Sequence, residues 1–541
     1  MSIITDENAL PGAINSDNYS IPGAGDPSIQ GFTRQTSYNA GTTVQFSVTG
    51  NCDILEIYRI GHYAGKQWRL VASVANTITT QPVPTIVANS NGQKTCSAWS
   101  ITASWNVPSN HVSGFHVAVA RNVARNNASW IPFTIRNDSR QADIVVCMST
   151  STWGGAYKHY NAQGDIFNGK NVYGSGITGV GDILTRSFCV TLDRPIITRQ
   201  TIVNHWDNYE SAVIDFLEEN GYDVKYVTSE DLHFRPSSWN NSKIYISCGH
   251  DEYWSQGMRD NVENFRDSGG HCLFMSANEV FWRTRYSADG RTIWCYKDTM
   301  PFAGHTAGTP FDPVTWTGTW RDTRWINKDP ESNLTGTFFR MNGIQFKSPV
   351  ISSSTYGTIP FWRNTTLVTS DITLNGSVGF EADEIKIPDG RPAKVLAAAF
   401  LNINGSYADD NGENYSGNGS LNPWGIVMHR LTAQAGVVVG FGTMAWAWLL
   451  SDKHRDGQAI KKLECQQAMV NLFKDLGASA ASLRTSNLID PSPVSLLDYD
   501  MPIAPEIPTS NVFAFDGTPF NPQIMVGGTL VPLTVPFTTS G

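Results

Sequence analysis

The sequence predicts an all-β unit followed by an α/β unit, and three observations support this fold class. Short runs of alternating apolar and polar residues fill the first 137 residues, with turn residues between them. From residue 138 onward, continuous apolar runs alternate with helix-like segments, which is typical of a parallel sheet with crossover helices. Charged residues make up only 16% of the chain, below the usual ~25%, whereas glycine (47) and proline (27) are abundant. We therefore expect a β-rich, loop-rich globular chain.

Residues 1–137 are predicted to form a small β-sandwich. Spacing and turn content favour a sandwich over a barrel, although the sequence does not decide between the two. The strand-like runs lie at residues 43–48, 54–59, 114–120 and 131–135.

Residues 138–480 are predicted to form an α/β domain. Short connections between its strands and helices imply right-handed crossovers and a parallel sheet, with function at the carboxyl ends of the strands. A segment rich in Gly, Thr and Asn, at about residues 300–425, indicates a large β-rich insertion. Buried strands are expected at 144–147, 223–227, 243–248, 271–275 and 437–441, and helices at 209–221, 255–268 and 459–476.

The last segment, residues 481–541, has a different composition. Nine prolines lie between residues 491 and 536, and no long helix pattern is present. We expect a Pro-rich C-terminal arm that is either disordered or extended and packed elsewhere.

Charge and hydropathy exclude two classes of partner. Lys and Arg number 39 and Asp and Glu number 48, giving a formal net charge of −9, which argues against binding to nucleic acid. No apolar run reaches the ~18 residues of a membrane span. The first 20 residues lack the basic and apolar regions of a signal peptide, so a cytoplasmic location is favoured over secretion by a non-classical route.

The eight cysteines show no CxxC spacing, so neither a zinc knuckle nor a disulfide-rich scaffold is expected. Inert buried thiols are the simplest interpretation. One pair, Cys52 and Cys96, could still be bridged across the N-terminal sandwich.

The densest polar cluster follows a predicted buried strand. His250, Asp251, Glu252 and Tyr253 lie directly between this strand and the next helix, where function concentrates in an open α/β sheet. We take His250, Asp251 and Glu252 as catalytic candidates. A structural alternative is that Asp251 and Glu252 complement the helix dipole while Tyr253 packs. Ser255 suits the N-cap position of the helix.

This cluster and several other motifs, in the same order, resemble the N,N-dimethylformamidase large-subunit-like domain. The resemblance covers roughly residues 6–475, with insertions, and it includes the β-sandwich that commonly precedes the domain. Its motifs lie at residues 58–65, 151–157, 216–224, 228–233, 249–255, 278–283 and 442–448.

The resemblance implies a glutamine-amidotransferase-like (flavodoxin-like) α/β fold and a mononuclear Fe(III) held by two tyrosines and one glutamate. Such an ion activates water for amide cleavage, and phenolate and carboxylate are suitable hard ligands. Tyr253 matches one tyrosine, and Glu381 matches the glutamate. The second tyrosine position holds Ala212, and Tyr209, on about the same helix face, is the nearest substitute. The expected metal ligands are therefore Tyr253, Glu381 and Tyr209, and no other cofactor is expected.

Two further positions depart from the family pattern. A histidine two residues before the glutamate ligand is Gly379 here, and a late region that should supply a catalytic glutamate reads Met428-His429-Arg430-Leu431. Metal affinity depends on such surrounding residues.

Two functions therefore stay open. The first is a metal-dependent hydrolase acting on a small amide or related C–N bond. The second is a non-catalytic structural, self-assembling or glycan-binding descendant, in which loop tryptophans stack on a sugar. Trp446 and Trp448 are instead expected to be core-facing residues of a strand. The candidate stacking residues are Trp282, Trp294, Trp320, Trp325 and Trp362.

Overall fold

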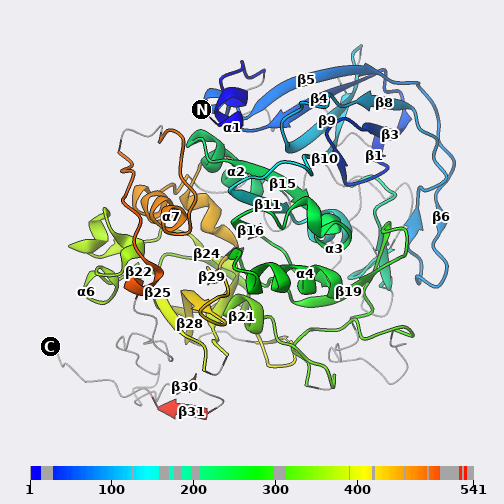
Figure 1. The fold of residues 1–541 in the computed structure, drawn as a ribbon. Helices are drawn as coiled ribbons and strands as arrows, with labels where there is room; N and C mark the ends of the chain where they lie inside the picture. Colours follow the sequence, from blue (N-terminus) through cyan, green and yellow to red (C-terminus); the bar gives the residue numbers. More distant parts are fainter. Residues whose placement is uncertain are drawn as a thin grey trace.

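The computed structural model describes most of the chain (Figure 1). None of the described helices has the length and apolar composition of a membrane-spanning segment. The described residues are 2–13, 28–124, 127–156, 170–175, 186–196, 206–297, 312–323, 325–388, 390–412, 414–416, 421–455, 459–483, 487–499, 523–526 and 529–532.

Two sheets near the N-terminus pack face to face, as in a β-sandwich (blue and cyan in Figure 1). Alternate residues of each strand point inward, so Val44 and Phe46 of one sheet share a core with Leu55 and Ile57 of the other. The first sheet contains β1 (Ile29–Thr33), β3 (Thr43–Gly50) and β8 (Ala103–Asn106); the second contains β2 (Ser37–Asn39), β10 (Asn127–Arg136), β9 (Gly114–Asn122), β4 (Ile54–Ile60) and β5 (Trp68–Ala75).

A seven-stranded sheet forms the centre of the molecule. Its strand order is β15-β11-β16-β18-β29-β28-β25; the first five strands are parallel to one another, β28 runs antiparallel to β29, and β25 runs antiparallel to β28. These strands are β11 (Ile144–Met148), β15 (Val224–Thr228), β16 (Ile244–Gly249), β18 (His271–Ser276), β25 (Ala393–Asn402), β28 (Leu421–Arg430) and β29 (Val437–Gly440).

Helices cover both faces of this sheet, which explains why its central strands are apolar throughout. In β11, Ile144 and Val146 share a core with α2 and α7, whereas Val145 and Cys147 face α3 and α4. Successive side chains of a strand point to opposite faces, so both faces need apolar residues. The helices are α2 (Glu210–Glu219), α3 (Ser229–Phe234), α4 (Gln256–Asp267) and α7 (Leu463–Asp475).

The segment predicted as an insertion is more closely integrated than expected, because β25 and β28 extend the central sheet. Two smaller four-stranded sheets accompany the central one, and only the second is built from strands of this segment. One contains β14 (Cys189–Thr191), β20 (Thr292–Trp294), β19 (Trp282–Tyr286) and β17 (Tyr253–Ser255); the other contains β24 (Val378–Ile385), β21 (Thr337–Lys347), β26 (Ser406–Ala408) and β27 (Asn414–Ser416).

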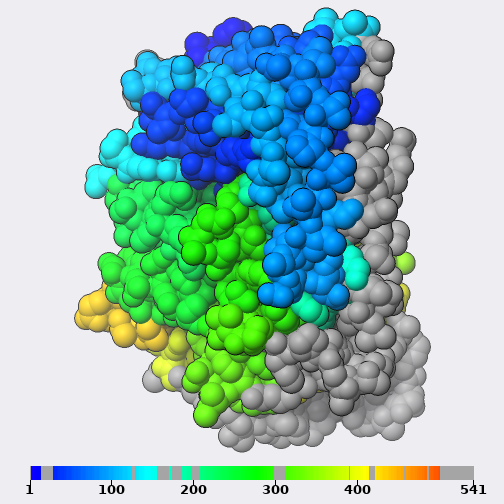
Figure 2. Space-filling model, turned by 90° about the vertical axis from the view of Figure 1, so that its right-hand side faces the viewer, coloured from blue at the N-terminus to red at the C-terminus, as the bar shows by residue number. Residues whose placement is uncertain are grey.

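The sandwich packs directly on the α/β part through buried charges. Arg59 of β4 donates two hydrogen bonds to Glu218 of α2, at 2.8 and 2.9 Å, and both side chains are fully buried. Figure 2 shows the blue N-terminal layer against the green middle of the chain, with a blue arm reaching along it. Between β6 (Thr85–Ile86) and β7 (Lys94–Thr95), Asn91 Nδ2 donates to the carbonyl of Arg186 at 2.6 Å, which fixes this hairpin of the N-terminal part to the segment before β14.

Three sequence expectations change in the structure. All eight cysteines are free and buried, and Cys52 and Cys96 belong to different apolar clusters, so the possible bridge is not formed. Trp446 and Trp448 are core residues as expected, but they lie in the 3-10 helix η8 (Met444–Leu449) and not in a strand. Most of the Pro-rich arm predicted for residues 481–541 lies outside the described residues.

Candidate active site

The predicted polar cluster begins where β16 ends, at Gly249. This residue has a φ of +73°, and a Cβ atom there would lie 2.5 Å from the Cβ of Tyr209. Glycine therefore allows both the left-handed turn and the close packing. The chain then passes through His250, Asp251 and Glu252 into β17, and Ser255 caps α4 by accepting a hydrogen bond from the Met258 amide at 3.3 Å, as predicted.

The π-helical segment η3 (Thr150–Ala156), which follows β11, holds this turn in place. Thr152 Oγ1 accepts hydrogen bonds from the amides of Glu252 and Tyr253, at 3.0 and 3.3 Å, and Ser151 Oγ donates to the Tyr253 carbonyl at 2.7 Å. The strand order of the parallel sheet reverses between β11 and β16. Loops at such a switch point form the usual ligand site of an open α/β sheet.

A second motif, residues 278–283, joins the same turn through its backbone. The amides of Phe281 and Trp282 donate to the Glu252 carbonyl at 3.0 and 2.9 Å. The Trp282 indole donates to Glu252 Oε1 at 2.7 Å, which fixes the carboxylate as well. The three motifs therefore converge on Glu252 and Tyr253.

His250 lies between two carboxylates. Its Nε2 atom is 3.4 Å from Glu252 Oε2 and 3.3 Å from Glu381 Oε2, and all three side chains are buried. Burial favours neutral imidazole, but Glu381 and Glu252 outweigh it and raise the pKa of His250 to about 9. Burial raises the pKa of Glu381 to about 7, although His250 opposes this shift. The group therefore contains a carboxyl group that titrates near pH 7 and an imidazolium that keeps its proton until about pH 9.

Tyr253 contacts a second cation, Lys297. The Lys297 ammonium donates to Tyr253 Oη at 2.8 Å, and Tyr253 Oη donates to Tyr173 Oη at 2.5 Å. The ammonium also lies 3.8 Å from the centre of the Trp282 ring and 4.1 Å from that of Tyr173, within cation–π range. Burial lowers the pKa of Lys297 to about 8, and Glu252 opposes this shift.

These contacts form one continuous chain. Tyr173 Oη lies 3.4 Å from both carboxylate oxygens of Glu252, which links the Lys297–Tyr253 pair to His250 and Glu381. Proton donors and acceptors thus alternate from Lys297 to Glu381. Such clusters of perturbed groups are common at catalytic sites.

Asp251 is the one member of the predicted catalytic set that points elsewhere. Its carboxylate accepts a hydrogen bond from Ser247 Oγ at 2.8 Å, back toward β16, and its carbonyl accepts one from the Val280 amide at 3.0 Å. Burial raises the pKa of Asp251 to about 6. These contacts give Asp251 a role in holding the turn.

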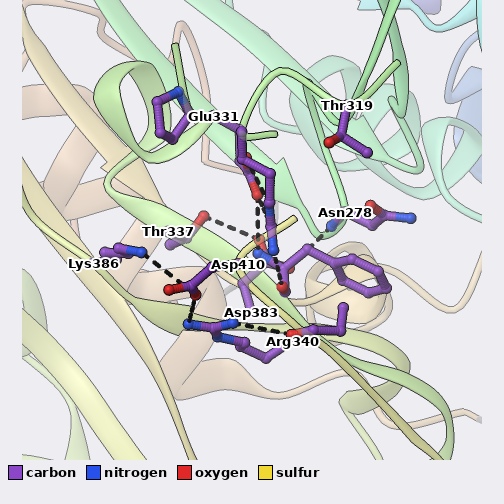
Figure 3. A network of polar contacts seen from close by, with 12 residues as sticks. Asn278, Thr319, Glu331, Thr337, Arg340, Asp383, Lys386 and Asp410 are labelled. Atoms are coloured by element: carbon purple, nitrogen blue, oxygen red, sulfur yellow. Dashed lines mark hydrogen bonds and ion pairs between the residues drawn. The ribbon is translucent and has the colours of Figure 1, made fainter. Parts of the chain in front are cut away.

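A network of polar contacts surrounds Asp383 on β24, the strand that also carries Glu381 (Figure 3). Two residues along β24, Asp383 accepts hydrogen bonds from the Asn278 amide and from Thr337 Oγ1, both at 3.0 Å. Arg340 of β21 pairs with Glu384 at 2.8 Å. The network fixes β24 against β21 and against the loop that carries Asn278.

The backbone around the site is strained. Asn278, Val280, Lys297 and Phe380 all have left-handed φ angles, between 39° and 52°. Each such residue costs about 1–3 kcal/mol, most for a β-branched residue such as Val280, and this strain is concentrated at functional sites in proteins.

Tyr209, the predicted substitute for the second tyrosine ligand, packs through its ring. Its ring stacks on Trp448, with ring centres 5.5 Å apart and planes 7° apart. Ala212, one turn further along the same segment, is fully buried in the apolar core. The segment that begins α2 therefore places an aromatic stack beside Gly249.

An iron ion bound to Tyr253 does not fit this arrangement. The ammonium of Lys297 already lies 2.8 Å from the phenol oxygen. Like unit charges at ~4 Å repel by about 4 kcal/mol in a partly buried setting, and a trivalent ion would be repelled more strongly. Glu381, the other predicted ligand, is engaged by His250. At the phenol oxygen of Tyr253, where the resemblance predicts iron, the structure places the ammonium of Lys297.

Lys297 and Tyr173 are the site residues that sequence reasoning missed. Neither lies in a motif or at the end of a central strand, and Lys297 is 44 residues beyond Tyr253 in the chain. A lysine in a loop is normally exposed to solvent, so no pattern in the sequence predicted that Lys297 is buried.

The tryptophans proposed for sugar stacking are mostly unavailable. Trp282, Trp320 and Trp362 are buried, with at most 4% of their surface exposed. Trp362 donates to the Leu396 carbonyl at 2.7 Å, as a core residue does. Trp294 and Trp325 are partly exposed.

Comparison with known proteins gives one family. A family model described as N,N-dimethylformamidase beta subunit-like, C-terminal, matches residues 54–459, about three quarters of the chain. A search of curated proteins found no match.

Proposed function

Because the chain belongs to the N,N-dimethylformamidase beta subunit-like, C-terminal family, we propose that it hydrolyses a small amide or a related C–N bond. The reaction is placed at the centre formed by His250, Glu252, Tyr253, Lys297 and Glu381. One observation carries the proposal: a chain of contacts joins two cationic groups, Lys297 and His250, to two carboxylates by way of Tyr253 and Tyr173. Perturbed pairs of this kind are suited to acid–base chemistry.

We also propose the glutamine-amidotransferase-like (flavodoxin-like) fold for the α/β part. The parallel strands, numbered by their order along the chain, lie in the spatial order 2-1-3-4-5, which is the flavodoxin-like order. The proposed site then lies at the switch point of that fold.

Each group has a defined task in amide hydrolysis. Glu381 accepts a proton from water, and the resulting oxygen nucleophile attacks the carbonyl carbon. Lys297 donates a hydrogen bond to the carbonyl oxygen as negative charge develops on it, and Tyr253, whose hydroxyl turns from Tyr173 to the substrate, donates a second. His250 donates a proton to the leaving nitrogen as the C–N bond breaks, and Glu252 keeps the imidazole charged and oriented.

The test uses three probe amides: N,N-dimethylformamide, formamide and acetamide. We expect the full-length protein to release amine or ammonia from at least one of them, and Tyr253→Phe to reduce the rate at least ~100-fold. Tyr222→Phe is the matched control, because Tyr222 is equally buried but packs on Phe473 in the apolar core. No release from any probe, or equal rates for Tyr253→Phe and wild type, would refute the proposal.

Elemental analysis of the native protein tests the family's Fe(III) separately. We expect no stoichiometric iron, because Lys297 occupies the approach to Tyr253. A coloured, iron-containing protein that loses its charge-transfer band in Tyr253→Phe and in Glu381→Gln would establish the iron site instead. Tyr209→Phe then shows whether Tyr209 is the second phenolate.

The pH dependence of kcat/KM follows from the shifted groups. Activity should rise as Glu381 loses its proton near pH 7, because the base must be ionised. It should begin to fall near pH 8, as Lys297 deprotonates, and be lost above pH 9, as His250 does. We therefore expect a bell-shaped profile with a maximum between about pH 7 and 8. A profile that is flat from pH 6 to 10 would contradict these roles.

A further inference from the structure

A second cluster of metal-binding side chains lies outside the proposed active site, where the sandwich meets α2. His62 comes from the loop between β4 and β5, and Asp215 and Glu219 come from α2. Because residues four apart lie on the same helix face, both carboxylates point toward His62. One ligand atom from each of the three residues lies within 4.8 Å of the other two.

The chemistry of these donors suits a first-row divalent ion. An imidazole nitrogen and two carboxylate oxygens are ligands that Zn²⁺ accepts, and three protein ligands leave a fourth position for water. When the His62 imidazole is neutral, the two carboxylates carry two negative charges, which a divalent cation balances. His62 Nδ1 is already 2.9 Å from Asp215 Oδ1, so only a small movement is needed to place an ion ~2.0–2.2 Å from each ligand.

Neighbouring groups hold the donors in position. Ser451 Oγ donates to the second oxygen of Asp215 at 2.6 Å, which leaves the first oxygen facing His62. The His62 amide donates to Asn8 Oδ1 at 2.7 Å and fixes the loop. His62 and Asp215 are buried, whereas Glu219 is half-buried and lies on the solvent side. An ion therefore has both a built site and a route into it.

We propose that His62, Asp215 and Glu219 form a zinc site that links the β-sandwich to the α/β part of the chain. The site is independent of the proposed amide hydrolysis. It recruits one ligand from the sandwich and two from α2, so a bound ion stabilises the contact between the two parts.

The test is titration of chelator-treated full-length protein with ZnCl₂ by isothermal calorimetry. We expect one tight site per chain, with binding weakened at least ~10-fold in Glu219→Gln. Asp260→Asn, an exposed carboxylate on α4, is the matched control, and Tyr253→Phe separates this site from the proposed active site; both should bind zinc as wild type does.

Thermal unfolding provides the second measurement. Zinc should raise the unfolding midpoint of wild type by a few degrees and that of Glu219→Gln by less, with equal midpoints for the two proteins in EDTA. Equal midpoints in EDTA show that the substitution at the half-buried Glu219 does not itself change the stability of the fold. The proposal is overturned if wild type binds no zinc, or if Glu219→Gln and Asp215→Asn both bind it as wild type does.

Discussion

Replacing Lys297 with methionine should lower kcat/KM for amide hydrolysis by about 10²–10⁴-fold. The substitution removes the cation 2.8 Å from Tyr253 Oη, and with it a donor for the developing oxyanion. Methionine retains an unbranched apolar stem, which can stay packed among the rings of Tyr173 and Trp282. The fold should therefore be preserved. The rate is measured on the best of the probe amides.

Lys243→Met is the control for this prediction. Lys243 lies at the opposite end of β16, is largely exposed and pairs with Asp143 at 2.7 Å. Its replacement should leave kcat/KM unchanged. A Lys297→Met protein with wild-type activity and an intact circular dichroism spectrum would remove Lys297 from the mechanism.

Replacing Arg59 with methionine should reduce the free energy of unfolding by about 3–5 kcal/mol. The substitution leaves Glu218 charged and fully buried, deprived of two hydrogen bonds from the guanidinium. The remaining donors, Tyr226 Oη and Asn8 Nδ2, both at 2.8 Å, cannot neutralise it. Denaturant unfolding followed by tryptophan fluorescence and by circular dichroism measures the loss.

Two further variants identify the cause. Arg121→Met breaks a partly exposed pair with Glu56, at 2.7 Å, and should cost at most about 1 kcal/mol. The double variant R59M/E218M removes both charges and should be more stable than Arg59→Met alone. Equal losses for Arg59→Met and Arg121→Met would show that the buried pair has no special role.

The central strands could be predicted because a strand buried on both faces is a continuous apolar run in the sequence. Ile144-Val145-Val146-Cys147 is apolar throughout, and the structure places its alternate residues against different helices. The Ser255 cap was equally visible, since its role depends on local hydrogen bonds. Trp446 and Trp448 misled the prediction, because alternation over five residues does not separate a strand from a short 3-10 helix.

The site was only half predictable. His250, Glu252 and Tyr253 directly follow the end of a predicted parallel strand. The topology of the sheet alone therefore brings them to the edge where function concentrates. Lys297 and Tyr173 reach the site through tertiary packing that no local pattern records. Glu381 was identified only through the family resemblance.

The departure at Gly379 has a structural explanation. A Cβ atom at this position would lie 2.6 Å from the Cα of Phe346, so no side chain fits without moving β21. The histidine that the family pattern places here is therefore excluded by the path of the backbone. The late His429 is also structural: it is buried and its Nε2 lies 3.2 Å from the Leu334 carbonyl.

The order of strands in the central sheet leaves one strand without its neighbour during synthesis of the chain. β18 ends at Ser276, but its neighbour β29 begins only at Val437. At ~5–20 residues per second, a ribosome needs roughly 10–30 s to make the intervening segment. Throughout that time one edge of β18 has no strand to pair with, and unpaired edges recruit strands from other chains. Nascent chains of this protein are therefore most prone to aggregation late in translation, and slow synthesis between residues 277 and 440 should lower the yield of folded protein.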